Sequence, residues 1–583
     1  MAAAACRTGN WRCADRNHAG GAASQGYTVG PMTSWPLLLA LFWSQEPEVS
    51  PAAEAAVQEP APEPQPLPPA GYGNPDTLPG RLKESVAAGG GTLVELARTS
   101  EGRAVLAASF GERQQSGRPE ILIVANLAGN RLAASELALR LCQHLAAGSP
   151  LLDVATVHVV ALANPDGAAH AFAGQDPWRG ASVDDDRDGL LDEDGPRDLN
   201  GDGRALWMRV RDPRGTLLPD PADPRATREA KKDESEAGGW LLMREGADTD
   251  HDRLTAEDSA GGARLDNNFP QRWREHAPES GSFPLSEPET RGLADFVLAH
   301  SHLALVIVLD DEDNSASPPK GKDRMDRGAS ELLSDDAQLL KVWSKRLYGD
   351  EGKGAGEAKP RGADDASGSF ADWAYFQAGA LVLESGLWSP PRETKLAGAE
   401  DLAKEAGDEA KELRWQDATY GGAGFVPWQE FTHPDFGAVE IGGWLPLVRD
   451  NPPAGEFEAL AARWTGFCDA LAADFARLTW ERVEVKALGG GVFEARALLV
   501  NRGLLATMSA AGAVNERPRP VRVTFEVPDG EMLAGRMVQS VESLPGLGGS
   551  REFRWIYRAG ASGARIRAVS QTAGQALTEL EAQ

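Results

Sequence analysis

The sequence predicts a mixed α/β domain with a largely parallel sheet flanked by helices, followed by a small all-β sandwich. Between residues 120 and 384, nearly continuous apolar runs of strand length alternate with amphipathic segments of helix length, as in strands covered on both faces. After about residue 480 the pattern changes to short alternating strands separated by turn residues, which favours a sandwich. The 583 residues, of which 42% are apolar, suffice for two or three domains.

Each element of the first domain follows from its own pattern. A helix is expected where Leu137, Leu141 and Leu145 recur every fourth residue. A second helix is expected at 287–300, and a long one from 456 to about 478 closes the domain. Four apolar runs predict buried strands, at 120–126, 156–162, 303–309 and 380–384.

Composition shifts divide the chain into four parts. We expect a signal-peptide region at 1–44, a disordered linker rich in Pro, Glu and Ala at 45–77, an α/β domain at 78–480 with an acidic insertion at 183–258, and a β-sandwich at 481–583.

The apolar run at 36–43 is too short to span a bilayer and is typical of a signal-peptide core. Translation starting at Met32 would shorten this region. The run therefore predicts export to the periplasm, the cell envelope or the extracellular space. The alternative is a disordered tail with a chance apolar patch. No later stretch of the sequence has the length and hydrophobicity of a membrane span.

The net charge of −28 repels nucleic-acid phosphates and anionic membrane surfaces, so neither is an expected partner. Cys142 and Cys468 each lie on an apolar helical stripe, where a buried thiol acts as a small apolar residue. Whether the two pair is left open by the sequence.

Acidic repeats in the insertion suggest calcium. Two stretches contain oxygen-bearing side chains on alternate residues followed by glycine, which lets several oxygens converge on one cation. Neither has the glutamate of an EF-hand. The alternative is a solvated acidic loop, although so many neighbouring acids repel one another without a counter-ion. The candidate calcium ligands are Asp184, Asp186, Asp188, Asp192, Asp194, Asp198, Asn200 and Asp202.

Six short motifs occur in the order found in one family. They are SEGR at 100–103, NPDG at 164–167, WMRV at 207–210, LDNNFP at 265–270, SEPET at 286–290 and SFADWAY at 369–375. Together they make the chain resemble the zinc carboxypeptidases, the carboxypeptidase A-type metallopeptidases, in particular a bacterial branch with acidic repeats and a terminal β-sandwich. The resemblance implies a carboxypeptidase-like fold and, for the family reaction, zinc-dependent hydrolysis of C-terminal residues from peptides.

The resemblance also shows what this sequence has lost. The family holds its zinc with two ligands from an H-x-x-E motif and a histidine after a later strand. The matching positions here are Ala128, Arg131 and Asp310. Alanine offers no side-chain donor atom, and arginine places a fixed positive charge where the dication would lie. Zinc is therefore expected of the family but not of this chain.

Other family positions are altered or retained. The carboxylate-binding Asn-Arg pair matches Asp266 and Asn267, which replaces the arginine and adds an acid. Glu384 matches the general base, and Arg209 the oxyanion-binding arginine. Without zinc we interpret both as relics, and we expect Arg131 to neutralise Glu384.

These observations lead to three hypotheses. The first is an inactive pseudoenzyme that binds a peptide or a cell-envelope ligand, or serves as a scaffold. The second is an active metallocarboxypeptidase with a rebuilt metal site at Asp310, Glu384 and neighbouring acids such as Asp311 or Glu312. The third is a calcium-stabilised structural protein of the cell envelope.

Overall fold

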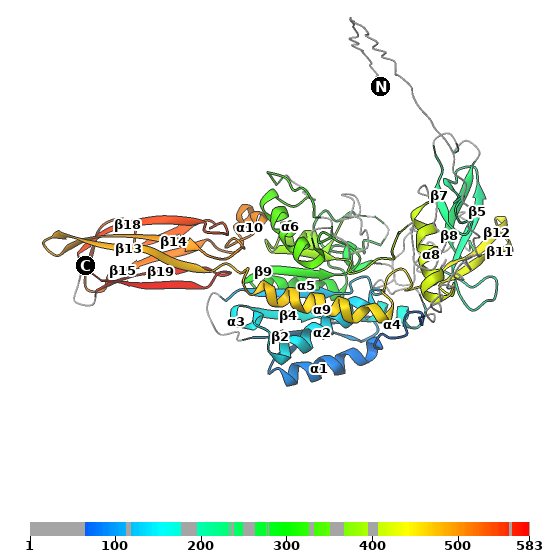
Figure 1. Ribbon diagram of the computed structural model, residues 1–583, viewed down its shortest axis with the longest axis horizontal. Coiled ribbons are helices and arrows are strands. Elements are labelled where there is room, and N and C mark those ends of the chain that lie inside the picture. The colour runs from blue at the N-terminus through cyan, green and yellow to red at the C-terminus, as the bar shows by residue number, and fades with distance from the viewer. Residues whose placement is uncertain are drawn as a thin grey trace, which may run out of the picture. The chain divides into compact units, whose positions relative to one another are not determined.

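A six-stranded sheet forms the centre of the α/β domain (Figure 1). Its order is β1 (Thr92–Arg98), β2 (Ala104–Phe110), β4 (Thr156–Val160), β3 (Glu120–Ala125), β9 (Leu303–Leu309) and β10 (Leu381–Ser385). The last four strands are mutually parallel, whereas β1 and β2 are antiparallel additions at one edge. The expected mixed, largely parallel sheet is confirmed, and its parallel strands are those that the four apolar runs predict.

This description comes from a computed structural model. It covers residues 65–111, 118–175, 195–231, 234, 238–248, 263–275, 277, 279–316, 318–325, 331–349, 367–393, 406–558 and 563–581.

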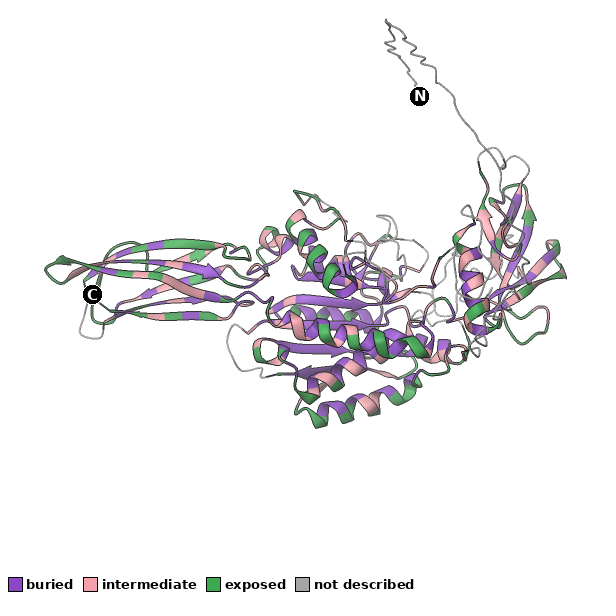
Figure 2. Cartoon of the chain, viewed as in Figure 1, coloured by how far each residue is buried: buried purple, intermediate pink, exposed green. Residues whose placement is uncertain are grey.

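Helices cover both faces of this sheet, because successive side chains of a strand point to opposite sides. Ile121 and Ile123 of β3 belong to one apolar cluster, and Leu122 and Val124 belong to another. Figure 2 shows the resulting buried interior on either side of the strands. Helices α1 (Leu78–Ala88), α2 (Leu132–Gly148), α6 (Ser334–Tyr348) and α9 (Ala454–Leu471) pack on the first face, and α5 (Pro288–Ala299) and α7 (Phe370–Phe376) on the second.

The long helix α9 is shorter than predicted. It ends at Leu471, and Leu478 already begins strand β13. Between them the buried carboxylate of Asp474 accepts hydrogen bonds from the Trp343 indole, at 2.9 Å, and from Arg346. These contacts fix the turn at the end of α9. Cys142 and Cys468 are both buried, and neither forms a disulfide.

The sequence did not predict a second sheet. It is antiparallel, in the order β11 (Phe425–His433), β12 (Gly437–Trp444), β5 (Trp207–Asp212), β8 (Gly239–Arg244), β6 (Leu217–Pro219) and β7 (Thr227–Glu229). Strands β5, β6, β7 and β8 all lie within the acidic insertion expected at 183–258. Helix α8 (Asp408–Tyr420) contributes Leu413 and Trp415 to an apolar cluster with Phe425 and Trp444 of this sheet.

The C-terminal residues form the expected all-β part. Two four-stranded sheets enclose one apolar cluster that includes Phe525 and Trp555. One sheet has the order β13 (Leu478–Gly489), β14 (Val492–Asn501), β18 (Ser550–Arg558) and β16 (Glu531–Ala534). The other has the order β17 (Val538–Val541), β15 (Val521–Glu526), β19 (Ala564–Val569) and β20 (Gln575–Leu580).

The remaining elements are short. They are η1 (Pro75–Thr77), α3 (Leu151–Val154), α4 (Pro165–Phe172), η3 (Leu265–Asn267) and α10 (Ala510–Asn515). Within the described residues, every helix is too short or too polar to cross a lipid bilayer.

Two of the sequence motifs meet through one buried carboxylate. Asn164 caps α4 by accepting the Gly167 amide, so the NPDG motif begins a helix. Asp166, in the first turn of α4, is fully buried. Its carboxylate accepts hydrogen bonds from the Thr99 hydroxyl at 2.8 Å and from Arg103 at 2.9 Å. The SEGR motif therefore acts here by holding the β1–β2 turn against α4.

Replacing Asp166 tests this contact. We expect Asp166→Ala to lower the free energy of unfolding by about 3–5 kcal/mol, because it leaves buried donors and a charged guanidinium without their acceptor. Asp76 is the matched control, since it pairs with the same Arg103 but is 59% exposed. Asp76→Ala should cost less than about 1 kcal/mol. Denaturant unfolding of both variants checks this, and equal losses would contradict it.

Candidate functional site

The retained and altered family positions gather at one edge of the main sheet. Parallel strands β3, β9 and β10 end there, and ligand sites of open α/β sheets lie at the carboxyl ends of the strands. Asp310 directly follows β9, and its amide donates to the carbonyl of Ser385 at the end of β10. Ala128 follows β3, and Glu384 lies on β10. The strand ends thus place Ala128, Asp310 and Glu384 on one edge.

Asp310 is bound directly by the loop that follows β3. The Ala128 amide donates to both carboxylate oxygens of Asp310, at 3.2 and 3.1 Å. Asp310 is 3% exposed. Burial raises its pKa well above the ordinary value of 3.8, and the charges of Asp311 and Asp266 raise it further. Arg131 and the Ala128 amide act in the opposite direction without cancelling the rise.

Arg131 is bound by Asp450, which lies in the segment before α9. Its guanidinium donates to the carbonyl of Asp450 at 3.1 Å and lies 3.5 Å from the Asp450 carboxylate. The neighbouring Asn130 amide donates to the same carboxylate at 3.1 Å. Asn126 has a left-handed φ of 61° and accepts the Arg131 amide, which fixes the turn between β3 and α2. The ion pair found here joins Arg131 to Asp450, whereas the sequence suggested Glu384.

The residues present do not fit the family zinc. A catalytic zinc needs three protein ligands with available lone pairs. Ala128 contributes only a backbone N–H, which already donates to Asp310. Arg131 contributes a cation bound to Asp450, and like charges repel. Asp310 is the one anionic donor among the three matching positions.

Glu384 is held by Asn314. Its backbone amide donates to the Asn314 side-chain oxygen at 2.9 Å, and the Asn314 side-chain nitrogen lies 3.3 Å from the Glu384 carboxylate. The Asn314 and Ser315 amides both donate to the Glu384 carbonyl. The side chain is partly exposed. Sequence reasoning missed Asn314, because it lies in a loop with no motif of its own.

The positions of the substrate-carboxylate clamp contribute to local structure. Asp266 is buried and accepts the Phe370 amide at 2.9 Å, at the start of α7. The Asn267 amide donates to the Arg264 carbonyl at 2.9 Å, inside the short 3-10 helix η3. Gly368 packs against Asn267 so closely that a Cβ there would lie 2.0 Å from the Asn267 carbonyl oxygen. This packing joins η3 to the segment that begins α7.

Arg209 lies on the second sheet rather than on the sheet that carries Glu384. It is 4% exposed, and its guanidinium pairs with Glu440 of the adjacent strand at 2.6 Å. The guanidinium also stacks on Trp240 and Trp428, with centroid distances of 4.0 and 4.2 Å. Burial lowers the pKa of Arg209. These contacts give Arg209 a structural role that the resemblance did not predict.

The acidic repeats are described only in part. Candidates Asp184 to Asp194 lie outside the described residues. In the second repeat, Asp198 accepts the amides of Gly201, Asp202 and Gly203. Buried Glu245 accepts the amides of Leu199, Asn200 and Leu206. In the described part of this loop, the oxygens of Asp198, Asn200, Asp202 and Glu245 therefore bind backbone or side-chain N–H groups.

Comparison with known proteins agrees with the fold. A family model described as zinc carboxypeptidase matches residues 91–393, more than half of the chain. A second, described as a domain of unknown function (DUF8731), matches residues 477–581. No curated protein matches the sequence.

Several solved structures resemble the chain weakly. A carboxypeptidase A from Helicoverpa armigera is 15% identical, with 60% of this chain and 74% of that chain covered and a TM-score of 0.34. A metallo-carboxypeptidase from Burkholderia cenocepacia is 14% identical, with 60% and 68% covered and a TM-score of 0.29. A structure of thrombin activatable fibrinolysis inhibitor is 10% identical, with 69% and 73% covered and a TM-score of 0.36.

The buried Asp310 predicts a pH dependence of stability. A carboxyl whose pKa is higher in the folded protein than in the unfolded chain stabilises the fold while protonated. That contribution is lost as pH rises from the ordinary pKa of 3.8 toward the raised value. We therefore expect Asp310→Asn to lessen the fall in unfolding free energy as pH rises above about 4. Denaturant unfolding at a series of pH values measures this, and parallel curves for the two proteins would contradict it.

Proposed function

The chain belongs to the zinc carboxypeptidase family, and on that premise we propose that it is a catalytically inactive member that binds a peptide or a cell-envelope ligand. One observation carries the proposal. The three positions that match the family's zinc ligands are engaged in protein contacts here: the Ala128 amide donates to Asp310, and Arg131 pairs with Asp450. A base such as Glu384 has little to act on without a metal-activated water.

The altered clamp indicates which ligands are disfavoured. A free C-terminal carboxylate is normally bound by arginine, and this chain has Asp266 and Asn267 at the matching positions. A buried acid repels a carboxylate. We therefore expect a peptide ligand to bind through an internal segment or a blocked C-terminus. Glu384, which is partly exposed and held by Asn314, supplies a polar group at the sheet edge for such a ligand.

A rebuilt metal site is the competing enzyme hypothesis. It would use Asp310, Glu384 and a further acid such as Asp311 or Glu312. In the structure Asp311 pairs with Arg264, so its carboxylate already has a cationic partner. Arg264 thus supplies a positive charge at Asp311, and the charge of Arg131 acts to lower the pKa of Asp310, although burial outweighs it.

Hydrolysis assays separate these two hypotheses. We expect the wild type to release no C-terminal residue from peptides above the level of Glu384→Gln, with or without added zinc, because the activated water is missing. Mass spectrometry of the peptides measures release. Zinc-dependent turnover would contradict the proposal if it disappears both in Glu384→Gln and on chelation, because the protein would then be an active enzyme.

Restoring the ligands tests whether the scaffold still presents their positions. The triple variant Ala128→His, Arg131→Glu and Asp310→His should bind one more zinc per chain than the wild type, because it supplies three donors at the sheet edge. The double variant Ala128→His and Asp310→His, which keeps the arginine, is the matched control and should gain less. Metal analysis after dialysis measures both, and no gain in the triple variant would show that the edge no longer has the family geometry.

Export and calcium binding remain proposals. Export rests on the apolar run at 36–43, and calcium binding on the acidic repeats. If calcium binds the insertion, calcium chloride should raise the melting temperature of the wild type by mass action. The variant Asp198→Asn should lose that rise, because the Asp198 carboxylate accepts several backbone amides at the centre of the second repeat. An equal rise in both proteins would exclude Asp198 as a ligand.

A further inference from the structure

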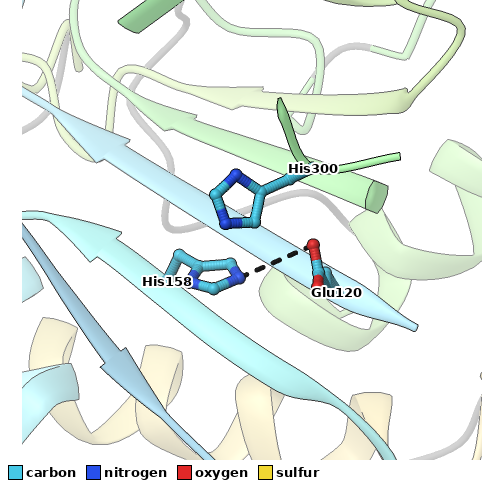
Figure 3. Close-up of side chains that lie close together, drawn as sticks. All are labelled: Glu120, His158 and His300. Atoms are coloured by element: carbon cyan, nitrogen blue, oxygen red, sulfur yellow. Dashed lines mark ion pairs between the residues drawn. The ribbon is translucent and has the colours of Figure 1, made fainter. Parts of the chain in front are cut away.

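A group of side chains that could bind a metal ion lies at the opposite end of the main-sheet strands from Asp310. Glu120 begins β3, His158 lies on the adjacent β4, and His300 ends α5. Their ligand atoms all lie within 4.8 Å of one another. Figure 3 shows the two imidazole rings and the carboxylate turned toward one another. From the sequence we expected only a helix at 287–300, which places His300 at its end, and strands that contain Glu120 and His158.

Two atoms of this group are buried without a hydrogen bond. His158 is fully buried, and its Nε2 has no partner within hydrogen-bonding geometry. The same holds for Oε2 of Glu120. These two atoms face each other at 3.7 Å, which is too long for a hydrogen bond. Buried polar atoms are rarely left in this state unless something else lies between or beside them.

The other ring nitrogens are already oriented by hydrogen bonds. Nδ1 of His300 lies 2.7 Å from the carbonyl oxygen of Phe296. A carbonyl only accepts, so the proton of the neutral ring is on Nδ1 and the lone pair is on Nε2. Nδ1 of His158 lies 2.7 Å from the Ser109 hydroxyl. Histidine ligands of metals are typically held through the second nitrogen in this way.

Aromatic packing fixes the planes of both rings. His300 stacks on Phe296 with a centroid distance of 3.9 Å and an interplanar angle of 30°. His158 meets the edge of Phe296 at 5.2 Å and lies 4.8 Å from His300, centroid to centroid. The imidazoles therefore have little freedom to turn away from the carboxylate, and the group is preorganised before any ion arrives.

We propose that Glu120, His158 and His300 form a binding site for a divalent transition metal of the zinc class. Two imidazoles and one carboxylate are a donor set that suits zinc, whereas calcium and magnesium prefer oxygen ligands alone. Zinc binds such ligands at about 2.0–2.2 Å, which in a tetrahedral site places the donor atoms about 3.3–3.6 Å apart. The 3.7 Å between Glu120 and His158 is close to this separation.

The site would serve a structural purpose. Its ligands come from two adjacent parallel strands and from the end of the helix that covers them, so one ion would tie three elements together. It differs from the family site in every ligand and lies at the amino end of β3 rather than beyond its carboxyl end. Zinc found in the purified protein would thus be no evidence of peptidase activity.

The test uses the full chain, stripped with chelator and then titrated with zinc chloride. Glu120→Gln and His300→Phe each remove one ligand, and the phenyl ring keeps the stack on Phe296. The first control is Glu101→Gln. Glu101 pairs with His170 at 2.6 Å, so this variant removes a histidine–glutamate contact outside the proposed site. The second is Asp310→Asn, which alters the family position.

The wild type should retain one zinc per chain and melt at a higher temperature when zinc is present. Glu120→Gln and His300→Phe should bind zinc at least about tenfold more weakly and lose that rise, while both controls keep it. X-ray absorption of the zinc-loaded wild type should show two imidazoles and oxygen ligands. This readout holds even if His300→Phe fails to fold. Three results would overturn the proposal. They are a wild type that binds no zinc at micromolar concentration, zinc binding that is abolished only by Asp310→Asn, and an X-ray absorption spectrum that lacks imidazole ligands.

Discussion

The hydrogen bonds from the Ala128 amide to the buried carboxylate of Asp310 are the constraint on which the carboxyl edge of the main sheet depends. They join the loop after β3 to the end of β9, and the Asp310 amide extends the connection to β10. In a zinc carboxypeptidase a dication would join the matching positions. Here the Ala128 amide and the nearby Arg131 partly offset the burial that raises the pKa of Asp310.

The motifs that survive in this chain are those with structural contacts of their own. Asp166 binds Thr99 and Arg103, and so holds two motifs together. Asn268 is fully buried, donates to the Ser286 hydroxyl and accepts from the Thr290 hydroxyl, which joins the LDNNFP and SEPET motifs. Such contacts stabilise the fold whether or not zinc is bound. A chain can therefore keep the family's framework after its metal ligands have changed.

The two ends of the sheet differ in chemistry. At the carboxyl end, Arg131 pairs with Asp450 and Arg264 pairs with Asp311. At the amino end, two oriented imidazoles and a carboxylate leave buried atoms of Glu120 and His158 without hydrogen bonds. Arg131 and Arg264 oppose a dication at the first end, whereas the donors at the second end suit the metal proposed there.

The sequence by itself determined the parallel strands, the α/β class, the terminal β-rich part and the family. Burial on both faces and short motifs each depend on consecutive residues, so they can be recognised without the tertiary structure. From the order of those motifs it also predicted which positions match the family's zinc ligands. Only the tertiary structure showed the second sheet, whose strand β5 pairs with β12 more than 200 residues later. It likewise decided that Arg131 pairs with Asp450, that Arg209 stacks between tryptophans, and that Glu120, His158 and His300 converge. Periodicity reports whether a residue is buried, but not which distant residue it will contact, since strand order and helix docking set that choice.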